Sequence, residues 1–260
     1  MHLILWWVLA CTPRPDLSPV ASTPATLGWK LVPGQELTYK LHTRLTGATE
    51  RIIREEHWTY RVDSVDSAGM ARLSGRLTAF GVARTDSTGS PSAVDIEPAQ
   101  EIERERLAQQ VVVLYLSAEG RLARIDGLEL HDSLPHRLLS LKLPNRAILP
   151  GEDWADPALA RPYANLLPAE TVVSVEGYQT YKGLYRYQGD VQALLESRGE
   201  VTAATEQGRS SIALKGSTWW DPDPGVLAWR SLEGELVQSD QAQVGHIQIQ
   251  IELLDVGLTD

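Results

Sequence analysis

A regular alternation of apolar and polar residues runs along most of this chain and limits the folds open to it. Between residues 36 and 45, the odd positions are mostly apolar and the even positions are charged or polar. Residues 247–253 repeat this period of two. Strands of parallel sheets are buried on both faces and read as continuous apolar runs. The alternation therefore predicts antiparallel sheet with one dry face and one wet face.

Turn and helix signals complete the predicted architecture. Strands are predicted over 36–45, 56–63, 73–79, 111–117, 121–126, 171–176, 181–187, 191–201, 210–220, 226–237 and 245–254. A helix is predicted over 98–110, where a proline lies near the first turn and acidic residues follow. A second helix is predicted over 131–143. We expect a mainly β protein whose curved antiparallel sheets form a half-barrel or a sandwich, with one or two short helices.

A short internal repeat suggests that the chain consists of two related halves. Residues 31–37 (LVPGQEL) resemble residues 148–154 (ILPGEDW), because each places a Pro-Gly turn and an acidic residue before a large apolar one. The alternative is ordinary turn chemistry that recurs by chance. The predicted halves are 27–143 and 144–260.

The first eleven residues resemble the signal of a bacterial lipoprotein. Leu3 to Ala10 is an apolar run of eight residues, which fits a signal-peptide core and is too short to span a bilayer. Cys11, the single cysteine, follows directly, as in the lipobox of that class. The resemblance implies a signal peptide over 1–10, cleavage before Cys11 and acylation of its thiol. The alternative is a buried N-terminal strand with an incidental cysteine.

The residues after the cysteine predict where such an anchor would hold the protein. Residues 11–26 include four prolines among small polar residues, which favours an extended linker. Thr12 follows Cys11 where inner-membrane lipoproteins carry Asp, so the resemblance favours the outer membrane. We expect a cell-envelope protein that faces the periplasm and contacts membrane lipid through acylated Cys11.

Composition excludes other classes. The chain has 34 acidic and 24 basic residues and a formal charge of −10, whereas nucleic-acid binding needs basic surface. A single cysteine allows no internal disulfide. No sequence motif for a nucleophile elbow, a phosphate loop or a zinc-binding helix is present. We therefore predict no catalytic residue, no metal and no cofactor.

Two sets of residues resemble metal sites but have simpler structural interpretations. His42 and His57 lie on predicted wet faces and could be neighbours, but a metal would also need carboxylates there. The run Asp221 to Gly225 resembles a calcium loop, yet it lacks the distal glutamate of an EF-hand. A solvated sheet face and a hairpin turn are the favoured interpretations.

Aromatic residues near the C-terminal strands indicate a candidate ligand site. Four of them are candidates for a ligand-binding wall: Tyr181, Tyr185, Tyr187 and Trp220. The three tyrosines share parity, and Gly183 leaves a gap among them. The alternative is cross-strand packing, because aromatic residues are favoured on any pleated surface.

The order of these features is similar to a family of bacterial exported proteins and lipoproteins whose function is unknown. The segments that carry the resemblance are residues 29–34, 62–65, 117–120, 149–154 and 216–221. The shape it implies is also similar to the curved half-barrels of periplasmic lipoprotein carriers, as a fold-level analogy. The resemblance implies an envelope β-protein and transfers no catalytic residue.

The sequence thus predicts a membrane-anchored envelope lipoprotein. Its favoured role is a non-catalytic binding module for an apolar ligand or a partner protein. The alternatives are an envelope hydrolase that uses surface carboxylates and a purely structural envelope protein.

Overall fold

The computed structural model describes residues 19–21, 24–86, 96–129, 132–167, 171–187, 189–205, 208–238 and 241–258. The predicted signal peptide, Cys11 and most of the predicted linker lie outside the described residues.

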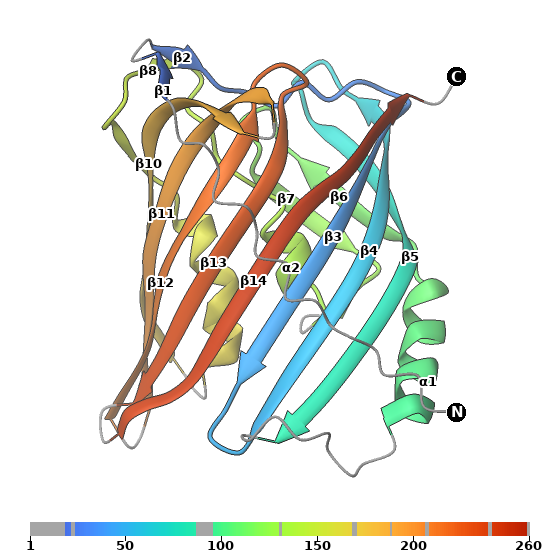
Figure 1. Cartoon of the computed structure of the whole chain (residues 1–260), viewed down its shortest axis with the longest axis vertical. Coiled ribbons are helices and arrows are strands. Elements are labelled where there is room, and N and C mark those ends of the chain that lie inside the picture. The colour runs from blue at the N-terminus through green and yellow to red at the C-terminus, as the bar shows by residue number, and fades with distance from the viewer. Residues whose placement is uncertain are drawn as a thin grey trace.

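The described residues form one large curved antiparallel sheet, which confirms the mainly β prediction (Figure 1). Its twelve strands are β1 (Pro19–Ala21), β3 (Gln35–Thr46), β4 (Glu50–Val65), β5 (Ala71–Asp86), β6 (Val112–Leu116), β7 (Leu122–Asp126), β9 (Asp153–Ala155), β10 (Thr171–Tyr187), β11 (Asp190–Thr205), β12 (Gly208–Asp221), β13 (Val226–Gln238) and β14 (Gln241–Leu258). A separate two-stranded sheet pairs β2 (Ala25–Thr26) with β8 (Ala147–Ile148).

The sheet consists of two meanders that meet side by side. The strand order is β1-β10-β11-β12-β13-β14-β3-β4-β5-β6-β7, and β9 pairs with β10. The last strand of the chain, β14, therefore pairs with β3, and residues from both predicted halves share this one sheet.

Helices are short, as predicted, but one of them differs from its prediction. Helix α1 (Ile96–Ala108) matches the prediction over 98–110. The second predicted helix, over 131–143, is confined to α2 (Leu134–Arg137). The chain beyond α2 is not helical, and its backbone N–H groups bond to a distant hairpin turn. Leu141 N–H donates to Gly120 O at 3.1 Å, and Leu143 N–H donates to Glu119 O at 3.0 Å. These bonds to a hairpin turn replace the bonds of a continued helix.

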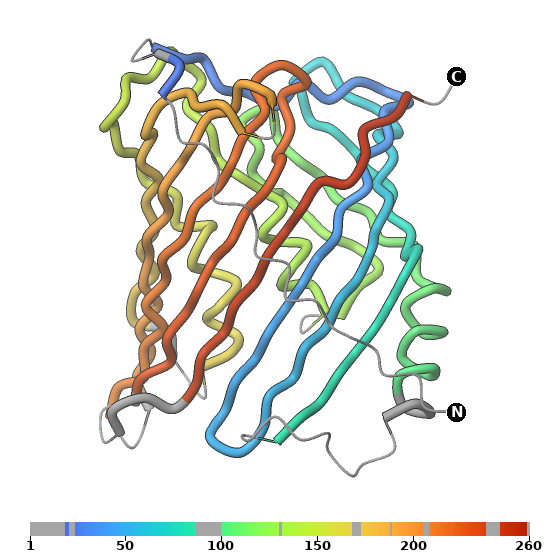
Figure 2. Tube along the Cα trace, in the orientation of Figure 1, coloured from blue at the N-terminus to red at the C-terminus, as the bar shows by residue number. Residues whose placement is uncertain are grey.

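The inner face of the curved sheet is covered by the chain itself. The covering segment is residues 132–167, which include α2 and two 3₁₀ helices, η1 (Pro157–Leu159) and η2 (Arg161–Leu166). Figure 2 shows this segment running behind β11 to β14. Its Leu138, Leu141 and Tyr163 belong to the same buried cluster as Trp58 and Leu195 of the sheet. The dry face that the alternation predicts is thus buried by the covering segment.

The two Pro-Gly turns of the internal repeat have the same local structure. In residues 32–35 and in residues 149–152, the fourth N–H donates to the first carbonyl, at 3.1 and 3.0 Å respectively. The side chain of the fourth residue also accepts from the first N–H, at 3.3 and 3.2 Å. Gly34 and Gly151 have φ values of 85° and 91°, as the third position of a type II turn requires.

Each meander also contacts the residues that precede the other meander. The hairpin turn between β6 and β7 carries Gly120, whose carbonyl accepts from Leu141, ahead of the second Pro-Gly turn. The turn between β12 and β13 carries Gly225, whose carbonyl accepts from Lys30 at 3.1 Å, ahead of the first Pro-Gly turn. These reciprocal bonds fix the two meanders to each other.

Candidate functional site

The four aromatic residues predicted as a ligand wall do not lie on one face. Tyr181 and Trp220 are fully buried on the inner face, where the Trp220 ring meets Trp29 at a centroid distance of 4.7 Å. Tyr185 and Tyr187 pack instead against Trp219, which alternates with Trp220 and therefore points to the outer face. The pairing of β10 with β11 shifts between Tyr181 and Gly183. This bulge adds one residue to β10, so Tyr185 and Tyr187 point to the face opposite to that of Tyr181.

The histidines of the wet face meet at one carboxylate. Glu55 Oε1 lies 3.3 Å from His57 Nε2, and Glu55 Oε2 lies 3.8 Å from His42 Nδ1. Lys40 also pairs with Glu55 at 2.9 Å. No group of three or more metal-binding side chains with suitable geometry occurs in the described part of the chain. The cluster is an ion-pair network on the outer face.

A buried arginine joins the covering segment to the sheet. The Arg230 side chain is 1% exposed and lies on the inner face of β13. Its Nη1 donates to the carbonyls of Leu138 and Ser140 at 2.5 and 2.9 Å, and its Nε donates to Thr218 Oγ1 at 2.9 Å. Burial lowers the pKa of Arg230 to about 10. The guanidinium stays charged at neutral pH and satisfies carbonyls that would otherwise be unpaired.

A second buried group joins α2 to the sheet. His136 Nδ1 is hydrogen-bonded to the hydroxyl of Tyr60, and His136 Nε2 lies 3.8 Å from Glu56 Oε2. Burial, with help from the charge of Arg54, lowers the pKa of His136 to about 3. Burial also raises the pKa of Glu56. These groups are enclosed in the interior, where they hold the covering segment to the sheet.

Asp132 provides a third polar attachment, at the start of the covering segment. Its carboxylate accepts from Arg54 at 3.0 Å and from Arg106 of helix α1 at 2.5 Å. Burial alone would raise the pKa of Asp132, but the hydrogen bonds and charges of the two arginines outweigh it and lower that pKa. The network fixes helix α1 and the covering segment to β4.

Beyond the covering segment, the inner face opens into an apolar hollow, which we call the end hollow. It has a volume of about 310 Å³ and lies at the end of the sheet where β3 turns into β4. Figure 1 shows this end of the sheet at the bottom. Six aliphatic side chains line it: Leu45, Ile52, Leu166, Ile212, Leu236 and Ile247. Strand register places Leu45 beside both Ile52 and Ile247.

The end hollow exists because the strands extend further than their cover. Leu166 ends η2, the last helix of the covering segment, and is 38% exposed. Leu45 is 37% exposed although it continues the inner face of β3. Ile212 and Ile247 form the floor and are almost fully buried. Such a concave aliphatic hollow can hold an apolar group and removes it from water.

Sequence reasoning did not identify the end hollow. Its residues have the same alternation as the rest of the core, so they read as ordinary buried positions. They differ from the rest of the core only because the covering segment ends before it reaches them. Where that segment ends depends on the tertiary path of residues 132–167.

No helix in the described part of the chain is long and apolar enough to cross a membrane.

No family model matches the sequence, and no curated protein matches it. Among solved structures, a DUF1329 family protein from Desulfovibrio piger ATCC 29098 is similar, with 8% sequence identity over 87% of this chain and 86% of that chain. The TM-score is 0.18, so the similarity carries no argument about the site.

Proposed function

We propose that the protein is an envelope lipoprotein, anchored through acylated Cys11, whose β-sheet binds an apolar ligand without catalysing a reaction. The observation that carries the proposal is the end hollow. Its walls are aliphatic, and its volume of about 310 Å³ lies within the range of small-molecule sites. An acyl chain or a similar hydrocarbon group is the ligand class that such walls favour.

The nature of the lining supports binding over chemistry. Of the residues at the hollow, Glu50 and His246 are titratable. Glu50 begins β4 and is exposed, and His246 alternates with the inward-facing Ile247. Neither group is set among the aliphatic walls as a general acid or base would need to be. A ligand in the hollow therefore meets hydrocarbon, which rewards burial of apolar area.

The anchor supports an envelope location. A triacylated cysteine contributes about 0.8 kcal/mol for each buried methylene, so several chains make a durable tether. Thr12 after Cys11 favours the outer membrane, and the linker would hold the sheet in the periplasm close to a source of lipid.

Two measurements on the full-length protein test the two parts of the proposal. Cells producing it are labelled with radioactive palmitate, and the label is expected in the wild type and absent from Cys11→Ser. Native mass spectrometry of the detergent-purified wild type is then expected to show a bound lipid in addition to the acyl chains on Cys11. An unlabelled protein refutes the anchor. A labelled protein that releases no lipid, or that retains a partner protein in its place, refutes the apolar-ligand role.

A further inference from the structure

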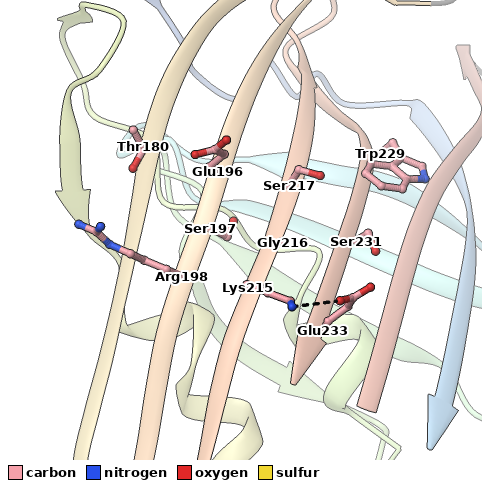
Figure 3. Close-up of a pocket in the computed structure, with 10 residues that line it drawn as sticks. All are labelled: Thr180, Glu196, Ser197, Arg198, Lys215, Gly216, Ser217, Trp229, Ser231 and Glu233. Atoms are coloured by element: carbon pink, nitrogen blue, oxygen red, sulfur yellow. Dashed lines mark ion pairs between the residues drawn. The ribbon is translucent and has the colours of Figure 1, made fainter. Parts of the chain in front are cut away.

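The outer face of the sheet carries a hollow of a different chemical character, which we call the outer trough. It has a volume of about 490 Å³ and crosses strands β10 to β13 on the side turned away from the core (Figure 3). Glu196, Ser217 and Ser231 follow one another across three neighbouring strands in direct register. The two serines are short, so the surface sinks between Glu196 and the half-buried indole of Trp229.

The charges around the outer trough balance. Its lining contains two cationic and two anionic side chains: Arg198, Lys215, Glu196 and Glu233. Lys215 lies 3.9 Å from Glu233, and Glu196 lies 3.2 Å from Lys182. Arg198 pairs with Asp153 at 3.0 Å. A site for an anion or a cation would carry an excess of the opposite charge, so this balance favours a neutral ligand.

Donors, acceptors and an aromatic ring lie together in the outer trough. The carboxylates accept hydrogen bonds, the lysine and arginine donate them, and the serine and threonine hydroxyls do both. Trp229 adds a flat apolar surface at one end (Figure 3). A saccharide matches this combination, because its hydroxyls both donate and accept around the ring edge while its C–H groups form apolar faces that pack on an indole.

The polar row continues past the outer trough across the sheet. Ser231 pairs with Gln250, and Gln250 pairs with His42. A linear chain of several sugar units could therefore lie across the strands. An extended peptide fits less well, because peptides that bind to sheets add to a free strand edge. The backbones of β12 and β13 are already paired on both sides.

From these observations we infer that the outer trough binds a neutral saccharide chain. Trp229 is its stacking platform, and its hydrogen-bonding groups are Glu196, Lys215, Ser217 and Ser231. This site is separate from the end hollow, which lies on the inner face, so either site can exist without the other.

The test is calorimetric titration of the purified full-length protein with three neutral probes: maltohexaose, cellohexaose and hexa-N-acetylchitohexaose. The protein is held in a polyoxyethylene detergent, because a detergent with a sugar headgroup would compete. At least one hexaose is expected to bind. Trp229→Ala is expected to weaken that binding at least tenfold, and Ser217→Gln, which fills the trough while retaining polarity, is expected to do the same.

Tyr115→Ala is the matched control, because it removes a partly exposed aromatic ring from strand β6, outside the outer trough. It is expected to bind the hexaose as the wild type does. Circular dichroism of each variant confirms that the sheet is retained. The inference is overturned if no hexaose binds at millimolar concentration, or if Trp229→Ala or Ser217→Gln binds the hexaose as well as the wild type does.

Discussion

Arg230 illustrates how single residues hold the inner face together. A guanidinium that is 1% exposed would be costly if unpaired, but three hydrogen bonds to Leu138, Ser140 and Thr218 engage it. Two of those bonds reach the covering segment, 92 and 90 residues away in the chain. The side chain thus fastens the cover that defines where the end hollow begins.

Replacing Arg230 should therefore weaken the fold measurably. Arg230→Met removes the three bonds and leaves two buried carbonyls unpaired, while it also relieves the cost of a buried charge. We expect the free energy of unfolding to fall by roughly 2–4 kcal/mol. Arg161→Met, on the exposed surface of η2, should change it by less than about 0.5 kcal/mol. Urea denaturation measures both, and equal effects would contradict the role of Arg230.

His136 makes stability depend on pH in a direction that can be worked out. Its pKa is about 3 in the folded protein because of burial, whereas a histidine in the unfolded chain titrates near about 6.5. Between these values the unfolded chain binds one more proton, so the free energy of unfolding falls as pH falls, by up to about 1.4 kcal/mol per pH unit. His136→Gln should remove this contribution.

The measurement is urea denaturation of the wild type and His136→Gln between pH 7 and pH 5. The difference in unfolding free energy between the two proteins should shrink steadily as pH falls. A difference that stays constant over this range would show that His136 takes up a proton equally in both states.

Among the structural elements, the two Pro-Gly turns were the best predicted, because proline and a glycine with positive φ are needed together in a type II turn. Gly151 has open space where a side chain would lie, so its φ of 91° alone decides the effect of a substitution. Gly151→Ala should cost about 1–2 kcal/mol of stability. Gly28→Ala, which also meets open space but has no positive φ, should be nearly neutral. Equal effects in thermal unfolding would refute this explanation.

The strands were predictable where one face is wet, because burial on one face imposes the period of two. The predictions erred at the β10 bulge, where one residue between Tyr181 and Gly183 reverses the faces. Gly183, a lone glycine within a strand pattern, is the sequence signal for such a bulge. The bulge explains why the four residues of the predicted aromatic wall are divided between the two faces of the sheet.

The covering segment could not be predicted from local pattern. Residues 132–167 have no regular period, and their conformation depends on bonds to distant residues such as Gly120 and Arg230. Propensity is a weak guide where tertiary contacts satisfy the backbone. The end hollow depends on where this segment stops, so it could not be predicted either.

At the scale of the whole molecule, one curved sheet offers two surfaces of opposite chemistry. The inner face is filled by the chain and leaves the apolar end hollow uncovered. The outer face is polar and carries the outer trough. A lipid-anchored protein with this arrangement would hold an apolar ligand at one end of the sheet while its wet face contacts the periplasm.

The end hollow makes a prediction about substitution at its wall. Leu45→Asp places a carboxylate in the apolar wall and should reduce binding of a fatty acid at least tenfold. Leu254→Asp is the matched control, because Leu254 is also an exposed leucine within a strand but does not line the end hollow. It should bind as the wild type does.

The most direct measurement is photocrosslinking with a diazirine-bearing fatty acid in membranes of cells that produce the full-length protein, followed by peptide mapping. We predict crosslinks on peptides containing Leu45, Leu166 or Leu236, reduced at least tenfold in Leu45→Asp and unchanged in Leu254→Asp. Crosslinks that map elsewhere, or that Leu45→Asp leaves unchanged, would contradict apolar ligand binding at the end of the sheet.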